Sequence, residues 1–277
     1  MAVVGAMMTT WVGANTYAVV VIARGGKDAT TGRDPASVGL AFSDVVYGRG
    51  AGGNELSGWF VQGDGDRPVV VVVHGYGGNR IGTLEVGPPL HELGYGLLYI
   101  ELGYVRGSSR YSGGEREADE VAQGTAWVAA RTGRPAVLLG FSGGAFASLA
   151  ATARGAPVIA VVADSGFVSF RHVAAFRAGL PRWLSVLMPA LYPLASGGGH
   201  LVDLAREIEG EALGVPALII HGRADETVPP GGGAALAELT GGELWELPGV
   251  GHTKAFDADR PSYIARIDRF IRDVEAS

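Results

Sequence analysis

Long uninterrupted apolar runs are the main pattern along the chain. The most extreme, PVVVVV at residues 68–73, contains five consecutive valines. A strand with one side in water would alternate apolar and polar residues, so this run predicts a strand covered on both faces, as in a parallel sheet. Similar runs recur over residues 96–101, 135–140, 158–163 and 217–221, with a more amphipathic one over 243–248.

Segments of helical length separate these runs. They cover residues 81–94, 117–133, 143–155 and 231–242. Strands that alternate with helices predict an α/β fold with a mostly parallel sheet that helices cover on both faces. Upstream of the valine run, the turn-rich GRGAGGNE separates residues 38–47 from residues 56–62, which predicts an antiparallel hairpin.

One long segment, residues 165–211, interrupts the alternation of strand and helix. It is too long for a connection and is rich in large apolar side chains: Phe167, Phe170, Phe176, Trp183, Leu187, Met188 and Tyr192. We interpret it as a helical cap inserted into a core that comprises residues 36–164 and 212–277.

The N-terminal residues 1–23 contain no charged side chain and have about the ~20-residue length that crosses a bilayer. They predict a membrane anchor, followed by a linker over residues 24–35. Thr9, Thr10, Asn15 and Thr16 lie within the stretch and weaken this prediction. The alternatives are a signal-type segment or misassigned start, and a buried helix. Basic residues follow the segment, so the positive-inside tendency would place the main domain in the cytoplasm.

The overall composition excludes several classes of protein. A hydrophobic content of 47% supports a large core, and a formal net charge of -6 argues against a nucleic-acid partner. The chain has no cysteine, so disulfides, thiolate nucleophiles and zinc-thiolate sites are excluded. The histidines show no metal-ligand spacing, and we therefore expect neither a metal site nor a cofactor.

The stretch GFSGGAF, residues 140–146, matches the G-x-S-x-G pattern of a serine nucleophile. With 45 glycines in 277 residues, such a match arises by chance about 0.4 times, so its context decides its meaning. An apolar strand precedes Ser142 and a helix-compatible stretch follows it, which is the arrangement that a nucleophile elbow requires. Ser142 is therefore our candidate nucleophile.

An acid and a histidine follow Ser142 in the chain. Asp225 stands four residues beyond a buried strand, with Glu226 as the alternative acid, and His252 lies in a loop after the last predicted strand. The order serine, acid, histidine is that of the α/β-hydrolase triad. Upstream, VVVHGYGG ends the valine strand, and we expect the backbone N–H groups of Tyr76 and Gly143 to form an oxyanion hole.

Taken together, HGYGGNR, GFSGGA, DSGFVSF, PALIIHGRADETVP and GVGH resemble the α/β-hydrolase superfamily, over roughly residues 40 to 272. More narrowly, they resemble its membrane-anchored members with one N-terminal hydrophobic helix and a short cap. The resemblance implies a triad of Ser142, Asp225 and His252. The loop ELGYVRGSSRYSGGE differs from the sequence pattern usual in the family. We therefore do not assign to it any substrate contact that the corresponding loop makes in relatives.

These features predict a serine hydrolase that cleaves esters or thioesters of a small-molecule acyl substrate. Two alternatives stay open: a peptidase or amidase with the same triad, and a non-catalytic, membrane-tethered binding protein with this fold. The sequence leaves the oligomeric state undetermined. We expect the substrate site to be lined by Phe141, Phe167, Trp183 and Met188.

Overall fold

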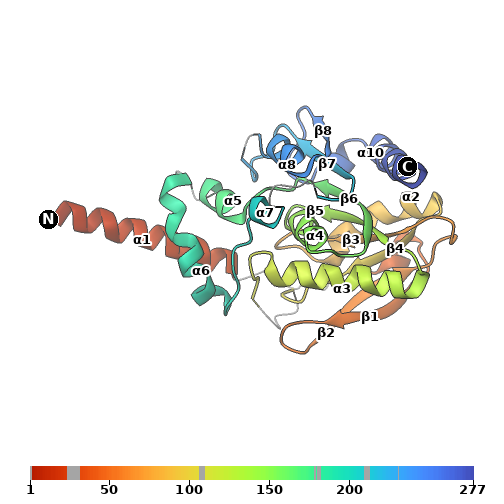
Figure 1. Cartoon of the computed structure of the whole chain (residues 1–277), viewed down its shortest axis with the longest axis horizontal. Helices are drawn as coiled ribbons and strands as arrows, with labels where there is room; N and C mark the ends of the chain where they lie inside the picture. Colours follow the sequence, from red (N-terminus) through yellow and green to blue (C-terminus); the bar gives the residue numbers. More distant parts are fainter. Residues whose placement is uncertain are drawn as a thin grey trace.

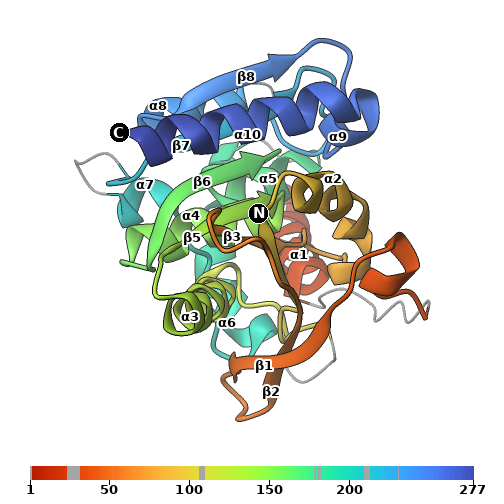
Figure 2. The same ribbon diagram turned by 90° about the vertical axis from the view of Figure 1, so that its right-hand side faces the viewer.

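The sheet is the centre of the protein (Figures 1 and 2). The computed structural model describes residues 2–23, 32–105, 110–177, 179, 182–208, 213–229 and 231–277. Within them, eight strands form one sheet in the order β1-β2-β4-β3-β5-β6-β7-β8. The strands are β1 (Ser43–Arg49), β2 (Glu55–Val61), β3 (Val69–Val73), β4 (Gly96–Ile100), β5 (Ala136–Phe141), β6 (Val158–Asp164), β7 (Ala217–Gly222) and β8 (Glu243–Leu247).

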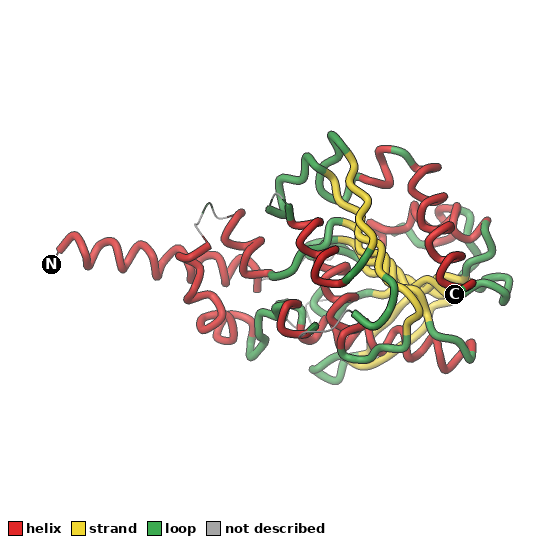
Figure 3. The backbone as a smooth tube through the Cα atoms, turned by 45° about the horizontal axis from the view of Figure 1, so that its top comes forward, coloured by secondary structure: helices red, strands yellow, loops and turns green. Residues whose placement is uncertain are grey.

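The pairing of the strands confirms the predicted fold class. Strands β3 to β8 pair in parallel, whereas β1 pairs antiparallel with β2 and β2 pairs antiparallel with β4. Helices lie on both sides of the twisted sheet (Figure 3). Those of the sheet layers are η1 (Pro35–Val38), η2 (Arg80–Val86), α2 (Gly87–Glu92), α3 (Glu115–Thr132), α4 (Gly143–Ala153), α8 (Gly232–Thr240), α9 (Ala255–Ala258) and α10 (Arg260–Ala276).

Alternate valines of β3 belong to two separate hydrophobic cores. Val71 and Val73 pack in the core that contains residues of α3, α4 and α8. Val70 and Val72 pack in the other core, with residues of α2 and α10. All four side chains are 0% exposed, and each such burial stabilises the fold by about 1.5–3 kcal/mol. The run of valines is thus explained by a strand that has no solvent face.

The segment 81–94 differs from a single helix. It forms the 3-10 helix η2, which Asn79 caps by accepting hydrogen bonds from the N–H groups of Ile81 and Gly82, and then the short α2. The reason lies in its composition, since Gly87 and two prolines interrupt regular α-helical hydrogen bonding at the junction.

The segment interpreted as a cap is helical where the structure describes it. It contains α5 (Phe170–Arg177), η3 (Arg182–Leu187), α6 (Met188–Ser196) and α7 (Leu204–Glu207). Figure 1 shows α5 and α6 alongside the end of the N-terminal helix that is nearer the sheet. The exact division into core and cap at residues 165 and 211 stays a prediction.

The N-terminal helix α1 (Ala2–Ala23) runs outward past the cap helices, with the N-terminus at the far end (Figure 1). Its second half contacts α5, η3 and α6, and Ala18 and Val19 are buried there. Asn15 is buried too, and its amide donates a hydrogen bond to the carbonyl oxygen of Trp11. The predicted anchor over residues 1–23 is not supported, because among the described residues no helix is both long and apolar enough to span a bilayer. Most of the predicted linker, residues 24–31, lies outside the described residues.

Candidate active site

The candidate nucleophile stands on a sharp turn between β5 and α4. Ser142 has φ 50° and ψ -113°, a strained conformation for a residue with a side chain. A Cβ atom on Gly140 would lie 2.6 Å from Cα of Ala145, and one on Gly144 would lie 2.4 Å from the carbonyl oxygens of Val73 and His74. The two glycines of the motif are therefore required by close packing, and the match is not an accident of composition.

Ser142, His252 and Asp225 form one chain of hydrogen bonds. The Oγ atom of Ser142 lies 2.8 Å from Nε2 of His252, and Nδ1 of the same imidazole lies 2.7 Å from Oδ2 of Asp225. The three residues come from the carboxyl ends of β5 and β7 and from the loop after β8, which meet at one edge of the sheet. The structure thus brings together the three residues that the sequence singled out.

Asp225 is held as a carboxylate. Burial alone would raise its pKa, but the hydrogen bond from His252 and those from the N–H groups of Val228 and Thr227 keep the pKa below its ordinary value. The two N–H groups lie 2.7 Å (Thr227) and 2.9 Å (Val228) from Oδ1, so both carboxylate oxygens are engaged. The alternative acid, Glu226, is exposed.

The two predicted oxyanion donors lie side by side. A Cβ atom on Gly143 would come within 3.0 Å of the backbone nitrogen of Tyr76, so the two peptide groups are in close contact. His74 fixes the loop that carries Tyr76, because its Nδ1 atom lies 3.0 Å from the carbonyl oxygen of Gly75. The hydroxyl of Tyr104 donates to the same carbonyl oxygen at 3.3 Å.

A cavity of about 340 Å³ opens at Ser142. Phe141, Val86 and Phe256 supply apolar surface, while Glu85, Lys254 and Asp257 place charged groups among the lining residues. Ser142, His252 and Tyr76 line it as well, so a bound molecule in this space would reach the hydroxyl of the serine.

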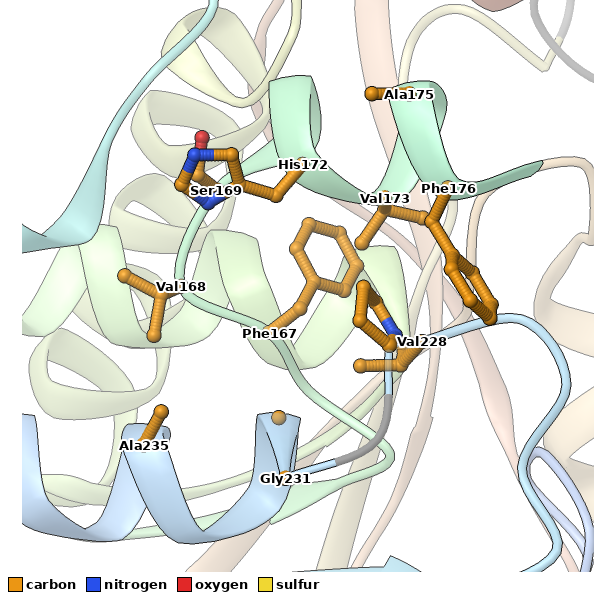
Figure 4. Close-up of a pocket in the computed structure, with 12 residues that line it drawn as sticks. Phe167, Val168, Ser169, His172, Val173, Ala175, Phe176, Val228, Gly231 and Ala235 are labelled. Carbon is orange, nitrogen blue, oxygen red and sulfur yellow. The ribbon is translucent and has the colours of Figure 1, made fainter. Parts of the chain in front are cut away.

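A second cavity, of about 320 Å³, lies between α5 and the start of α8 (Figure 4). Its lining is mostly apolar and includes Phe167, Val173, Phe176 and Val228, and neither Ser142 nor His252 lines it. The aromatic ring of Phe167 stacks on Phe146, with 4.9 Å between the ring centroids.

The four residues expected to line the substrate site therefore separate. Phe141 lines the cavity at Ser142, and Phe167 lines the second cavity. Met188 is 0% exposed within α6 and lines neither of these two cavities. The side chain of Trp183 lies outside the described part of the structure.

Sequence reasoning missed Asp164 and Ser165, which stand at the end of the buried strand β6 beside the elbow. Asp164 pairs with Phe141 in the ladder between β5 and β6, so it stands next to the turn at Ser142. Its position at the end of the apolar run over residues 158–163 is the same signal that pointed to Ser142.

Within the described residues, no group of three or more histidine, aspartate or glutamate side chains is arranged to hold a metal ion.

Comparison with sequence profiles of known protein families gives no match, and comparison with the sequences of curated proteins gives none either. Solved structures do match. The esterase Pf2001 of Pyrococcus furiosus superposes with a TM-score of 0.70 at 19% identity, over 90% of this chain and 97% of that one. The α/β-hydrolase GrgF of Penicillium gives 0.61 at 18% identity, over 86% and 100% of the two chains.

The esterase RhEst1 of Rhodococcus gives a TM-score of 0.57 at 19% identity, over 85% of this chain and all 100% of that one. Identities this low establish a shared fold, and activity has to be argued from the site itself. The strand order, the elbow and these three structures agree. The protein has the α/β-hydrolase fold.

Proposed function

We propose that the protein is a serine hydrolase that cleaves carboxylic esters or thioesters through an acyl-enzyme on Ser142. The observation that carries the proposal is the unbroken hydrogen-bond chain from Ser142 Oγ through His252 to Asp225, on a strained elbow that opens into a cavity. The names of the similar Pyrococcus and Rhodococcus proteins, both esterases, support the same class of reaction.

In this proposal the Oγ atom of Ser142 attacks the acyl carbonyl carbon while Nε2 of His252 accepts the hydroxyl proton. The negative charge that develops on the carbonyl oxygen is stabilised by the N–H groups of Tyr76 and Gly143. The carbon–oxygen or carbon–sulfur bond then breaks, and His252 returns the proton to the departing alcohol or thiol. Water attacks the acyl-enzyme by the same route and releases the acid.

Asp225 has two tasks in this sequence of steps. Its Oδ2 atom accepts a hydrogen bond from Nδ1 of His252, which leaves Nε2 free of a proton and facing Ser142. Its negative charge then stabilises the imidazolium that forms when Ser142 loses its proton. The hydrogen bonds from Thr227 and Val228 keep the carboxylate in place through both steps.

The volume of the cavity at Ser142 favours a small substrate. A volume of about 340 Å³ is at the lower end of ligand-binding cavities, which span roughly 300–1,000 Å³. Phe141 and Phe256 would contact apolar parts of the substrate. The charged groups of Glu85 and Lys254 would suit a polar substituent.

The proposal is tested first with a fluorophosphonate probe and intact mass spectrometry on the wild type and Ser142→Ala. One adduct on the wild type and none on the variant is the expected result. Turnover of p-nitrophenyl esters, acyl thioesters and aminoacyl p-nitroanilides then separates ester, thioester and amide cleavage. A folded wild type that forms no adduct and turns over none of these compounds would refute the proposal and favour a non-catalytic binding protein.

A further inference from the structure

A second hydrogen-bond network adjoins Ser142 and His252 and is centred on Asp164. This residue ends β6 and is 1% exposed. Its Oδ1 atom accepts a hydrogen bond from the hydroxyl of Ser165 at 2.8 Å, and its Oδ2 atom accepts one from the hydroxyl of Tyr263 at 3.0 Å. A carboxylate buried with hydroxyl groups rather than a cation is unfavourable for stability, so its presence calls for a functional reason.

The network reaches both reacting side chains through the backbone. The carbonyl oxygen of Asp164 accepts a hydrogen bond from the N–H of Ser142 at 2.8 Å. The hydroxyl of Ser165, which donates to Asp164, accepts a hydrogen bond from the N–H of Thr253 at 2.9 Å. Thr253 directly follows His252, and its own hydroxyl donates to the carbonyl oxygen of His252 at 2.8 Å.

Backbone strain is concentrated in the same place. Among the described residues, the non-glycine residues with positive φ are Ser142 at 50°, Ser165 at 55° and Thr253 at 52°. Each such conformation costs on the order of 1–3 kcal/mol and persists only where the surroundings hold it. All three belong to one hydrogen-bonded array, in which Asp164 is the buried acceptor.

We infer that Asp164 is a positioning residue for catalysis, which holds the nucleophile through its carbonyl oxygen and the histidine loop through the chain Asp164 to Ser165 to Thr253. The inference rests on the proposed function. In this arrangement Asp164 fixes the distance between Ser142 and His252, whereas Asp225 fixes the orientation of the imidazole. Its negative charge also stabilises the imidazolium form of His252.

The electrostatic surroundings of Asp164 agree with this role. The titratable groups that face it are Tyr263 from α10, His252 from the loop after β8, and Asp225 from the loop after β7. Burial raises the pKa of Asp164 to about 6, against the hydrogen bonds from Ser165 and Tyr263 and the charge of His252, which lower it. His221 of β7 faces Asp225 and His252 in turn.

The test compares the wild type with Asp164→Asn and Ser165→Ala. The asparagine retains an acceptor for Ser165 but removes the charge, and the alanine retains the charge but breaks the link to Thr253. We expect kcat for an ester to fall about 10-fold to 100-fold in each variant, the range for small misplacements of reacting groups, with KM changed less than threefold.

The second-order rate of fluorophosphonate labelling, compared with the free energy of unfolding of each variant, separates positioning from mere stabilisation. The labelling rate should fall together with kcat in Asp164→Asn and in Ser165→Ala. Thr240→Val, which removes another buried hydroxyl, bonded to Leu236, is the control for stability and should leave kcat and the labelling rate unchanged.

Folded variants with kcat and a labelling rate within twofold of the wild type would overturn the inference. If Asp164→Asn does not fold, the kcat of Ser165→Ala decides. Labelling of the wild type tests the proposed function by itself, so a wild type that is labelled, with both variants labelled equally fast, would refute this inference alone.

Discussion

The Nε2 atom of His74 accepts a hydrogen bond from the backbone N–H of Leu102 across 3.2 Å, in the interior of the protein. Its Nδ1 atom lies 3.0 Å from the carbonyl oxygen of Gly75, to which it donates. One ring nitrogen accepts and the other donates, so only the neutral imidazole satisfies both contacts. Burial, the main cause, lowers the pKa of His74 to about 4. His74 therefore supports the candidate oxyanion loop and has no acid–base role.

This burial predicts acid sensitivity of the fold. The pKa of His74 is 6.5 in the unfolded chain and about 4 in the folded protein, so the unfolded chain binds the proton first as the pH falls. Its contribution to the free energy of unfolding is intact above pH 6.5 and is lost between pH 6.5 and 4, by about 3 kcal/mol. Urea unfolding at pH 7 and 4.5 should show a smaller loss for His74→Gln than for the wild type. Equal losses would contradict the assignment.

Gly144→Ala should damage both stability and activity. Its Cβ atom would lie 2.4 Å from two backbone carbonyl oxygens, which cannot move as a flexible side chain can. We expect a loss of about 1–3 kcal/mol in the free energy of unfolding and a slower reaction with the fluorophosphonate probe. Gly13→Ala is the matched control, because a Cβ atom there meets nothing within 4 Å. Similar losses in the two variants would argue against the close packing of the elbow.

Asp225→Asn should lower kcat by about 10⁴-fold, the loss typical when a triad acid no longer fixes the histidine tautomer. Glu226→Gln should leave kcat within twofold of the wild type, since Glu226 is exposed and Asp225 contacts His252. Steady-state hydrolysis of a p-nitrophenyl ester measures both. The opposite ranking of the two variants would assign the acid to Glu226.

Glu120→Gln should stabilise the protein at alkaline pH. The carboxyl group of Glu120 accepts a hydrogen bond from the N–H of Gly103 at 2.8 Å, and burial raises its pKa to about 8, against 4.5 in the unfolded chain. The folded protein therefore holds its proton longer, and the wild type loses stability as the pH rises from 4.5 to 8, by on the order of 5 kcal/mol. Denaturant unfolding at pH 5 and 9 should show that the advantage of the variant grows with pH; a constant difference would contradict this.

Much of the fold could be predicted from local patterns. The valine run at residues 68–73 predicts a doubly covered strand, and β3 is buried on both faces. The helix predicted over residues 117–133 is α3, which ends where Gly133 adopts φ 71°. Such features depend on neighbours in the sequence, and the sequence shows them directly.

The rest depends on contacts between distant segments. Ser142 and His252 are 110 residues apart, and only the order of motifs suggested that they meet. Nothing local shows that the N–H of Thr253 bonds to Ser165, or that Met188 is buried away from the two cavities. The membrane interpretation of residues 1–23 gave more weight to length and lack of charge than to the polar side chains that interrupt the apolar surface of α1.

The identical valines of β3 carry no information about register. In most strands a slip by one residue moves apolar side chains into water, and this penalty fixes the pairing. Here both faces are apolar, so a slipped β3 would bury the same kind of side chain in each core. Its alignment must come from its ends, where Pro68 precedes the strand and the carbonyl oxygens of Val73 and His74 lie against Gly144. The close contact between Gly144 and these carbonyl oxygens therefore also fixes the register of β3 in the sheet.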